Sequence, residues 1–253
     1  MLPFSKGKYR VRLAETAADQ ESAQRLRHLA FVDEQGAKSD QLGLDRDGYD
    51  DFSTHFLIEN RKSGKLVCCF RIMRFGSGAE ISKSYSAQFY ELSALETYAA
   101  PMVELGRFCV HPDENDPDLL RVAWAAITKY VDNNGVELLF GCSSFRGTNA
   151  DNYSDVFTIL RDNHLAPSRW LPRVKAPKVF NFSNLLGRSG DAKKGMQLMP
   201  PLLKSYLMMG GVVSDHAVID RRMNTLHVFT GVEIRTIPAA RKRLLRALSA
   251  GAA

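Results

Sequence analysis

The chain has 253 residues, of which 45% are hydrophobic and 25% charged, which is typical of a globular protein with a sizeable core. No apolar run approaches the roughly 18 residues of a membrane span, and the N-terminus lacks a signal peptide's apolar stretch, so we expect a cytoplasmic protein. The net charge of +6 is uneven: residues 1–150 hold 18 Lys and Arg against 21 Asp and Glu, whereas residues 151–253 hold 16 against 7. The basic C-terminal part predicts an acidic partner: a carrier protein, an anionic membrane surface or nucleic acid.

The N-terminal third predicts, in order, a strand, a helix, a long loop and a two-stranded hairpin, at residues 9–13, 19–31, 31–52, 54–59 and 65–74. Asp19 is the expected N-cap of the helix, with Ala23, Leu26 and Ala30 on its inner face. The loop is rich in Asp and Gly, and loops of that length without structure of their own are usually functional.

The rest of the chain predicts alternating helices and strands, at residues 86–97, 102–110, 116–133, 136–142, 151–164, 200–208, 217–219, 225–232 and 238–248. Strand and helix alternate from residue 102 to 164, which predicts an α/β fold with at least one parallel strand pair. No repeat or linker is evident. We therefore expect a single domain over 1–253, with a core at 1–165 and a basic C-terminal extension at 166–253.

The expected strand at 102–110 carries two charges, Glu104 and Arg107, in an otherwise apolar run. A charge in a core strand is costly unless it is paired or used, so this strand is a candidate for chemistry. Alternation of side chains would place the two charges on opposite faces of the sheet. Glu104 is then a candidate general base, or else the partner of Arg71 or Arg74 in a structural ion pair.

Several motifs occur in a recognisable order. Arg25 and Phe31 precede the Asp-rich loop, a hairpin ending in Arg71 follows, and Glu104-Leu-Gly-Arg-Phe lies on a strand. This order resembles the acyl-homoserine-lactone autoinducer synthases, which have a Gcn5-related N-acyltransferase fold. The resemblance implies a mixed central sheet flanked by helices, followed by the C-terminal extension.

A closer resemblance covers nearly the whole chain. Its motifs are Asp45-Arg-Asp-Gly-Tyr-Asp50 followed by His55-Phe-Leu-Ile, Glu104-Leu-Gly-Arg-Phe, Gly141-Cys-Ser-Ser-Phe145, and Pro200-Pro-Leu-Leu-Lys-Ser-Tyr206. Together they resemble the bacterial L-ornithine Nα-acyltransferases, which are similar to the autoinducer synthases and to hemolysin-like acyltransferases. This resemblance implies an enzyme that moves a 3-hydroxyacyl chain from acyl carrier protein to the α-amine of L-ornithine, forming lyso-ornithine lipid.

The segment after the Glu104 strand bears on the acyl donor. Acyl-CoA-dependent members of the fold have a Gly-rich loop there, whose backbone N–H groups bind the pyrophosphate of CoA. Here the segment is His111-Pro-Asp-Glu-Asn-Asp-Pro-Asp118, which has no glycine and four carboxylates. We therefore expect the acyl group to arrive on the phosphopantetheine of acyl carrier protein, and we expect no bound cofactor and no metal.

The remaining candidate site residues lie in the resembling motifs. Asp45, Asp47 and Asp50 would contact the amino groups of the acceptor, with Arg25 or Arg71 on its carboxylate; alternatively, the acidic loop is merely solvated or holds a cation. Arg107 would position the donor or the carboxylate, or form a sheet-edge salt bridge. His55 is either a site residue or a satisfied buried histidine. Candidates for lining the acyl and pantetheine groove are Phe31, Ser143, Ser144 and Phe145.

Two surfaces are candidates for partners. Basic residues at 169–194 would dock acyl carrier protein, and the basic amphipathic helix at 238–248 would lie on an anionic membrane. The protein would then be peripheral on the inner face of the bacterial cytoplasmic membrane. A nucleic-acid partner is not expected, because no stacking platform or helix-turn-helix signature is present. The alternative functions are acyl transfer to S-adenosylmethionine and non-catalytic binding of a membrane or carrier protein.

Overall fold

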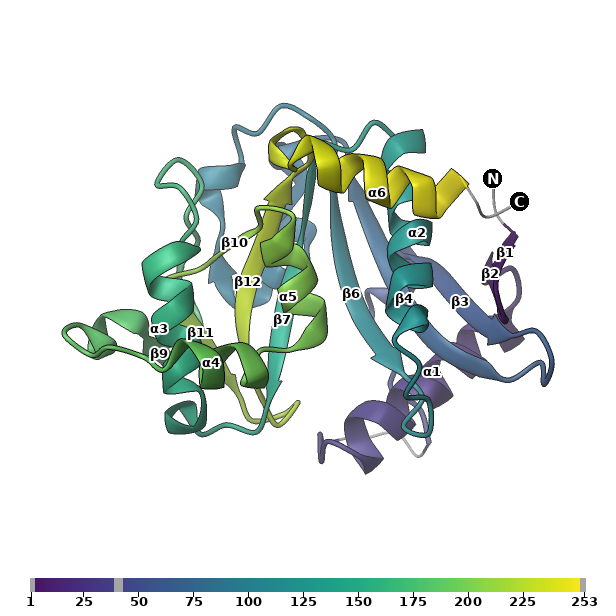
Figure 1. Cartoon of the computed structure of the whole chain (residues 1–253), viewed down its shortest axis with the longest axis horizontal. Helices are drawn as coiled ribbons and strands as arrows, with labels where there is room; N and C mark the ends of the chain where they lie inside the picture. The colour runs from purple at the N-terminus through teal and green to yellow at the C-terminus, as the bar shows by residue number, and fades with distance from the viewer. Residues whose placement is uncertain (1–2, 39–42, 251–253) are drawn as a thin grey trace. The chain divides into compact units, whose positions relative to one another are not determined.

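Figure 1 shows a computed structural model of the chain, which describes residues 3–38 and 43–250. Residues 39–42, within the predicted acidic loop, lie outside the described residues. The chain divides into two units: the first contains Met1–Arg74, Leu105–Val136 and Pro238–Ala253, and the second contains Phe75–Glu104 and Glu137–Ile237. A single domain with an extension from residue 166 stays a prediction.

The first unit is built on strands in the order β1-β2-β3-β4-β6. These strands are β1 Phe4–Lys6, β2 Tyr9–Leu13, β3 Thr54–Asn60, β4 Leu66–Phe75 and β6 Met102–Val110, and the helices are α1 Ala17–His28, α2 Asp118–Asn133 and α6 Ala239–Ala250. The pairs β1–β2, β2–β3 and β3–β4 are antiparallel. Strand β6 begins in the second unit and continues into the first from Leu105. The predicted first strand, hairpin and Glu104 strand are therefore confirmed.

The N-cap of helix α1 lies three residues before the expected one. It is Thr16, whose hydroxyl accepts from the backbone N–H of Asp19, while the Asp19 carboxylate accepts from the N–H of Thr16. This reciprocal capping box satisfies two donors that the first helical turn would otherwise leave free, so the prediction of Asp19 as N-cap is wrong. The inner face is as predicted, because Ala23, Leu26 and Ala30 are buried in one apolar cluster with side chains of β3, β4 and β6. A π-helical segment, Leu29–Asp33, continues α1.

The second unit contains antiparallel strands in the order β7-β12-β11-β9, and β10 also pairs with β12. The strands are β7 Leu138–Arg146, β9 Val179–Asn181, β10 Val212–Val213, β11 His216–Asp220 and β12 Thr225–Glu233, with a separate pair of β5 Tyr90–Glu91 and β8 Arg173–Val174; the helices are α3 Ser154–Asn163, α4 Ala192–Leu198 and α5 Pro201–Met208. Phe157 and Leu160 of α3 and Leu203 of α5 are buried in one core cluster with Leu226 and Val228 of β12.

The helix predicted at residues 86–97 is absent. Two 3₁₀ turns, Ser86–Gln88 and Ser93–Leu95, flank β5 instead. Local hydrogen bonding is one reason: the hydroxyl of Ser84 accepts from the N–H of Ala87, and the carboxylate of Glu91 accepts from the N–H of Ser93. Such side-chain acceptors compete with the helical backbone ladder.

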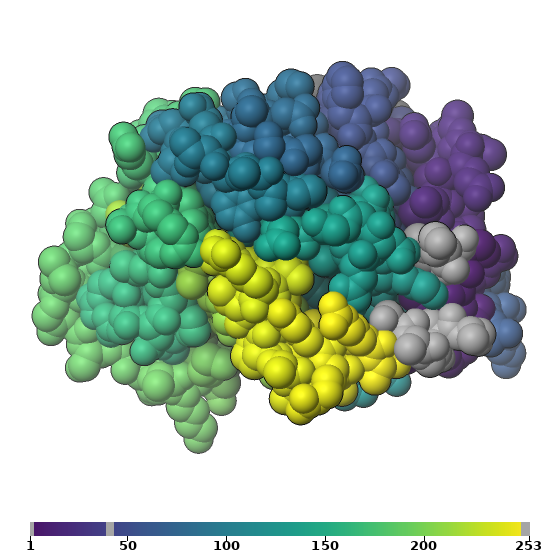
Figure 2. All heavy atoms as spheres, turned by 90° about the horizontal axis from the view of Figure 1, so that it is seen from above, coloured from purple at the N-terminus to yellow at the C-terminus, as the bar shows by residue number. Residues whose placement is uncertain are grey.

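Helix α6 packs across α2 in the first unit, as Figure 1 shows, and Arg246 Nε lies 3.1 Å from Asp132 Oδ2. Figure 2 shows one face of α6 uncovered. Arg243 and Leu244 of this helix are exposed. The predicted C-terminal helix is confirmed. No helix in the described residues is both long and apolar enough to cross a membrane.

Buried His227 on β12 makes the stability of the protein depend on pH. Its Nδ1 lies 3.0 Å from the hydroxyl of Tyr90, and burial lowers the pKa of the ring to about 4. Below pH 6.5 the ring of His227 is protonated in the unfolded chain but stays neutral in the native protein. The free energy of unfolding should therefore fall by about 2–3 kcal/mol between roughly pH 6.5 and 4.

Urea unfolding of the wild type and of His227→Phe at pH 7.5, 5.5 and 4.5 measures this effect. The variant should show a flatter dependence, with a residual slope from His55, whose pKa burial also lowers. Equal slopes in the two proteins would refute the assignment.

Candidate functional site

In the first unit, the acidic loop meets α1, β4 and β6 in a cluster of three arginines and three aspartates. We call it the arginine–aspartate cluster, and its members are Arg27, Asp45, Asp47, Asp50, Arg71 and Arg107. Three guanidinium groups balance three carboxylates. Asp45, Asp47 and Asp50 of the acidic loop are therefore charge-compensated rather than merely solvated.

Asp50 is the buried anchor of this cluster, with 2% of its side chain exposed. Its Oδ1 accepts from Arg27 Nη1 at 2.7 Å and from Arg71 Nη1 at 2.6 Å. Burial opposes ionisation of Asp50, but the hydrogen bonds and charges of the two arginines outweigh it and hold its pKa below the ordinary value. A carboxylate so enclosed holds the loop in place and is closed to a substrate.

Asp45 and Asp47 form the outer edge of the cluster, with 14% and 22% of their side chains exposed. Arg107 bridges them, because its Nε lies 2.9 Å from Asp45 Oδ2 and its Nη2 lies 2.9 Å from Asp47 Oδ2. Burial also opposes ionisation of Asp47, yet Arg71 and Arg107 hold its pKa below the ordinary value. Both oxygens of Asp47 already accept two hydrogen bonds each, from the N–H of Tyr49, from Arg71 and from Arg107, whereas the bonds to the Asp45 carboxylate converge on its Oδ2, so Asp45 has more accepting capacity for a cationic ligand.

Arg107 has a left-handed backbone, with φ of 52°, in the middle of β6. A non-glycine residue in this region costs of order 1 kcal/mol and persists only where its surroundings hold it. Here both ends of the guanidinium are tied to the acidic loop. The prediction that Glu104 and Arg107 point to opposite faces of the sheet assumed an unbroken extended strand. The left-handed backbone at Arg107 interrupts the strand, so the alternation of side chains does not decide on which faces the two residues lie.

Two residues from the opening helix differ from the prediction. Arg25 does not join the cluster: its side chain is 63% exposed and pairs with Glu21 on the same helix. Arg27, which the sequence analysis missed, takes that place with 1% exposure. The sequence does indicate Arg27, because this charged residue comes four residues after Ala23 and therefore lies on the apolar face of the helix. Phe31, half-buried, packs against the apolar cluster of the first unit.

His55 lies beneath the acidic loop on β3 and is buried. Its Nε2 lies 2.9 Å from the backbone oxygen of Asp50, and since a carbonyl only accepts, the ring donates this bond. Burial lowers the pKa of His55, so the ring is neutral at neutral pH. His55 thus has the contacts of a satisfied buried histidine that supports the loop, and a catalytic role for it stays a prediction.

The second unit holds a separate polar site around Glu104, which is 4% exposed. Its Oε2 accepts from the backbone N–H of Tyr85 at 2.7 Å, and its Oε1 accepts from the N–H of Ser86 at 2.7 Å and from the Ser86 hydroxyl at 2.5 Å. The Ser86 hydroxyl also lies 3.4 Å from Cys142 Sγ. Burial raises the pKa of the Tyr206 phenol, and the charges of Glu104 and Cys142 raise it further.

This Glu104 site consists of Glu104, Tyr85, Ser86, Cys142 and Tyr206. The sequence analysis identified the carboxylate but missed Ser86, which it assigned to a helix, and it assigned no role to Tyr206. Arg71, the predicted alternative ion-pair partner of Glu104, forms ion pairs with Asp47 and Asp50 in the first unit.

The predicted groove residues on β7 divide between core and surface. The strand continues to Arg146, so Ser143, Ser144 and Phe145 lie within it rather than after it. Ser143 is buried and accepts from the Thr230 hydroxyl, and Phe145 is in the core cluster of the second unit. Ser144 alone is exposed, and only this residue is available to line a groove.

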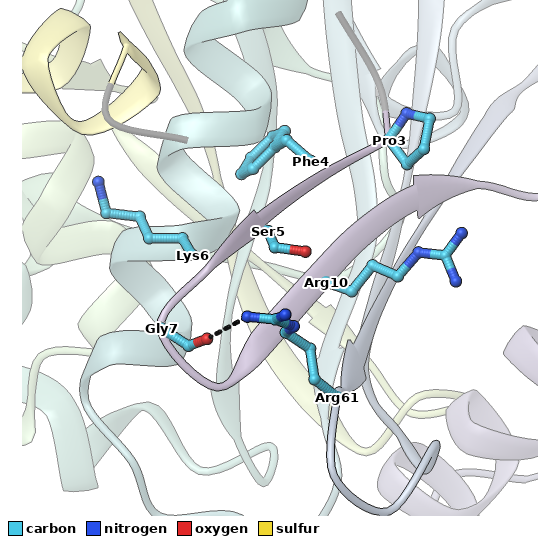
Figure 3. A pocket seen from close by; sticks show the side chains of 7 residues that line it. All are labelled: Pro3, Phe4, Ser5, Lys6, Gly7, Arg10 and Arg61. Carbon is cyan, nitrogen blue, oxygen red and sulfur yellow. Dashed lines mark hydrogen bonds between the residues drawn. The ribbon is translucent and has the colours of Figure 1, made fainter. Parts of the chain in front are cut away.

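No group of three or more His, Cys, Asp or Glu side chains suited to a metal ion occurs in the described part of the chain. A surface pocket of about 550 Å³ lies at the hairpin of β1 and β2 in the first unit (Figure 3). Figure 3 shows Lys6 and Arg10 pointing away from each other, while Arg61 donates to the backbone oxygen of Gly7. The polar groups that line this pocket do not converge on one point, so the pocket is not a candidate active site.

Comparisons with known proteins agree with this architecture. The family model for an acetyltransferase (GNAT) domain matches residues 26–125. The structure of an N-acyl amino acid synthase from uncultured soil microbes superimposes with a TM-score of 0.53 at 12% identity, covering 91% of this chain and 94% of that one. The chain therefore has the predicted Gcn5-related N-acyltransferase fold.

Two curated relatives sharpen the class. The L-ornithine N(alpha)-acyltransferase of Rhodobacter capsulatus is 33% identical over 230 residues, which cover 87% of this chain and 88% of the relative. The enzyme of the same name from Brucella abortus is 28% identical over 243 residues, which cover 91% and 86%. The chain belongs to the L-ornithine N(alpha)-acyltransferase family, and the family resemblance of the motifs is confirmed.

Proposed function

We propose that this protein transfers a 3-hydroxyacyl chain from acyl carrier protein to the α-amine of L-ornithine and so forms lyso-ornithine lipid. The names of the curated relatives support ornithine as acceptor. The observation that carries the chemistry is the buried carboxylate of Glu104, held by three hydrogen-bond donors. No resident cofactor or metal takes part in the proposed reaction.

The proposed step is direct aminolysis of a thioester in a ternary complex. The neutral α-amine attacks the thioester carbon, a C–N bond forms, the C–S bond breaks, and the phosphopantetheine thiolate leaves. Glu104, directly or through one water, takes the proton that the amine loses, and the departing thiolate is protonated in turn. An ionised carboxylate in a buried site is suited to this role because its accepting capacity is not spent on bulk water.

The arginine–aspartate cluster is proposed to bind the acceptor. Asp45 and Asp47 would contact an ammonium group of ornithine, and Arg107 would contact the carboxylate. Asp50 and Arg71 are less suited to substrate because their side chains are 2% and 4% exposed. Glu104 and Arg107 are three residues apart on β6, so the chain itself limits their Cα atoms to a separation of about 10 Å.

The donor is proposed to be a carrier protein rather than CoA. The segment 111–118 between β6 and α2 has four carboxylates and no glycine, which disfavours binding of a pyrophosphate. Several basic residues predicted to dock the carrier are exposed on the second unit; for example, the side chains of Arg173 and Lys194 are 73% and 62% exposed. An acidic carrier protein complements these charges.

We further propose that α6 holds the protein on an anionic membrane, where an acylated product would enter the lipid phase. The outer face of this helix exposes Arg243 beside Leu244, the combination that interfacial helices use. Sedimentation with phosphatidylglycerol vesicles measures this binding, and Arg243→Glu should weaken it. Unchanged sedimentation of the variant would count against the membrane proposal without affecting the proposed chemistry.

The function is tested by incubating the purified chain with a 3-hydroxyacyl group on acyl carrier protein or on CoA, together with ornithine, lysine or S-adenosylmethionine. Mass spectrometry should detect an amide with ornithine when the carrier protein is the donor. Product only from acyl-CoA would overturn the donor, product only from another amine would overturn the acceptor, and no product with any pair would overturn the enzyme.

A further inference from the structure

The hydroxyl of Ser86 lies 2.5 Å from Oε1 of Glu104. Ser86 is fully buried and sits at the start of a 3₁₀ turn whose two leading N–H groups also point at the same carboxylate. The segment from Ser86, which the sequence predicts to be helical, instead forms a turn whose donors face the carboxylate of Glu104. This arrangement indicates a dedicated support for Glu104.

The direction of the hydrogen bonds follows from counting protons. A carboxylate only accepts, so the single hydroxyl hydrogen of Ser86 goes to Glu104. Cys142 Sγ, at 3.4 Å from the same hydroxyl, is then the donor and Ser86 Oγ the acceptor. The result is a directed array from Cys142 of β7 through Ser86 to Glu104 of β6.

We propose that Ser86 is a positioning residue, which keeps Glu104 ionised and fixes the orientation in which its carboxylate accepts a proton from the substrate amine. The proposal rests on the proposed function, in which Glu104 is the base. A hydroxyl donor stabilises the charged carboxylate more than the neutral acid, so its removal should make Glu104 harder to ionise. The substrate amine would then meet a protonated acid at pH values where the wild type is active.

Other titratable groups of the second unit that face this site are Tyr85, Cys142 and Tyr206. Phenols and thiols ordinarily titrate at alkaline pH, and burial raises the pKa of Tyr206 further. The α-ammonium of ornithine also titrates on the acid limb of the rate profile, because the attacking amine must be neutral, but it is common to all variants, so a difference between the acid limbs of the variants reports Glu104 rather than these neighbours.

The test compares the pH dependence of kcat/KM in the wild type, Ser86→Ala, Ser86→Thr and Ser84→Ala. In Ser86→Ala the acid limb should move up by about one pH unit, which is the size expected for loss of one charge-assisted hydrogen bond. Activity on that limb should then drop about tenfold, with a smaller loss at alkaline pH. Ser86→Thr, which keeps the hydroxyl, should restore the wild-type limb.

Ser84→Ala is the matched control, because Ser84 is also buried in this segment but its hydroxyl accepts from Ala87 N–H rather than contacting Glu104. Its acid limb should stay in place. A carbon-13 NMR titration of labelled glutamate, with Glu104→Gln to assign the signal, gives a second readout that needs no turnover and applies even if a variant is slow.

An unmoved acid limb and an unmoved Glu104 signal in folded Ser86→Ala would overturn the role of Ser86. A different result would contradict the proposed function: retained turnover in Glu104→Gln, regardless of the result for Ser86→Ala. Loss of turnover in Glu104→Gln with no shift in Ser86→Ala would remove this inference alone.

Discussion

Replacement of Glu104 by Gln is expected to lower kcat for amide formation by about 10²- to 10⁴-fold, the contribution typical of a general base. The amide is close in size to the carboxylate but cannot take a proton from the amine. If the role is confined to proton transfer, KM for ornithine should change by no more than about threefold, since binding is assigned to the arginine–aspartate cluster. Steady-state kinetics with 3-hydroxyacyl carrier protein measures both values.

The control for this prediction is Glu91→Gln. Glu91 is a carboxylate of the same unit that also accepts a hydrogen bond from a backbone N–H, that of Ser93. Its replacement should leave kcat within about twofold of the wild type. Retention of most of the turnover in folded Glu104→Gln would show that Glu104 is a structural acid and that the amine loses its proton elsewhere.

Replacement of Asp50 by Asn should have the largest effect on stability. It removes the charge that compensates Arg27 and Arg71, whose side chains are 1% and 4% exposed, and leaves guanidinium groups buried without full compensation. Breaking a buried ion pair by removing one partner costs about 3–5 kcal/mol, and we expect a loss of that size in the free energy of unfolding. Urea unfolding at pH 7 measures it.

The same experiment has an internal control and a pH dependence. Asp51→Asn changes the exposed neighbour and should alter stability by less than about 0.5 kcal/mol. The native pKa of Asp50 lies below that of the unfolded chain, so its contribution is present above about pH 4 and is lost as pH falls further. The gap between wild type and Asp50→Asn should therefore narrow below pH 4, and a gap that is small at pH 7 would contradict the anchoring role.

Regular elements were predictable where hydrophobic period and capping agreed. Strand β6 has the predicted bounds, and the hairpin of β3 and β4 lies within a residue of them. The segment 86–97 was not predictable, because its turns depend on acceptors such as Glu104, which is distant in sequence. Local sequence propensity does not predict a hydrogen bond between residues that only folding brings together.

The site was predictable in its residue types more than in its geometry. Asp45, Asp47 and Asp50 were recognised together, but their division into one buried anchor and two accessible carboxylates depends on tertiary burial. The left-handed backbone of Arg107 has no signature in the sequence, since the residue is not a glycine. Arg27 was predictable, because it lies four residues after Ala23 on the face of α1 that was correctly expected to be buried, but the sequence analysis chose Arg25 instead.

The central claim is N-acylation of the α-amine of ornithine, and one measurement tests it most directly. The chain is incubated with 3-hydroxyacyl carrier protein and ornithine carrying nitrogen-15 at the α position only, and the product is fragmented by tandem mass spectrometry. The account predicts a single amide whose acylated nitrogen is the heavy isotope and whose formation is lost in Glu104→Gln. Acylation of the unlabelled δ-nitrogen, or no amide at all from folded protein, would contradict it.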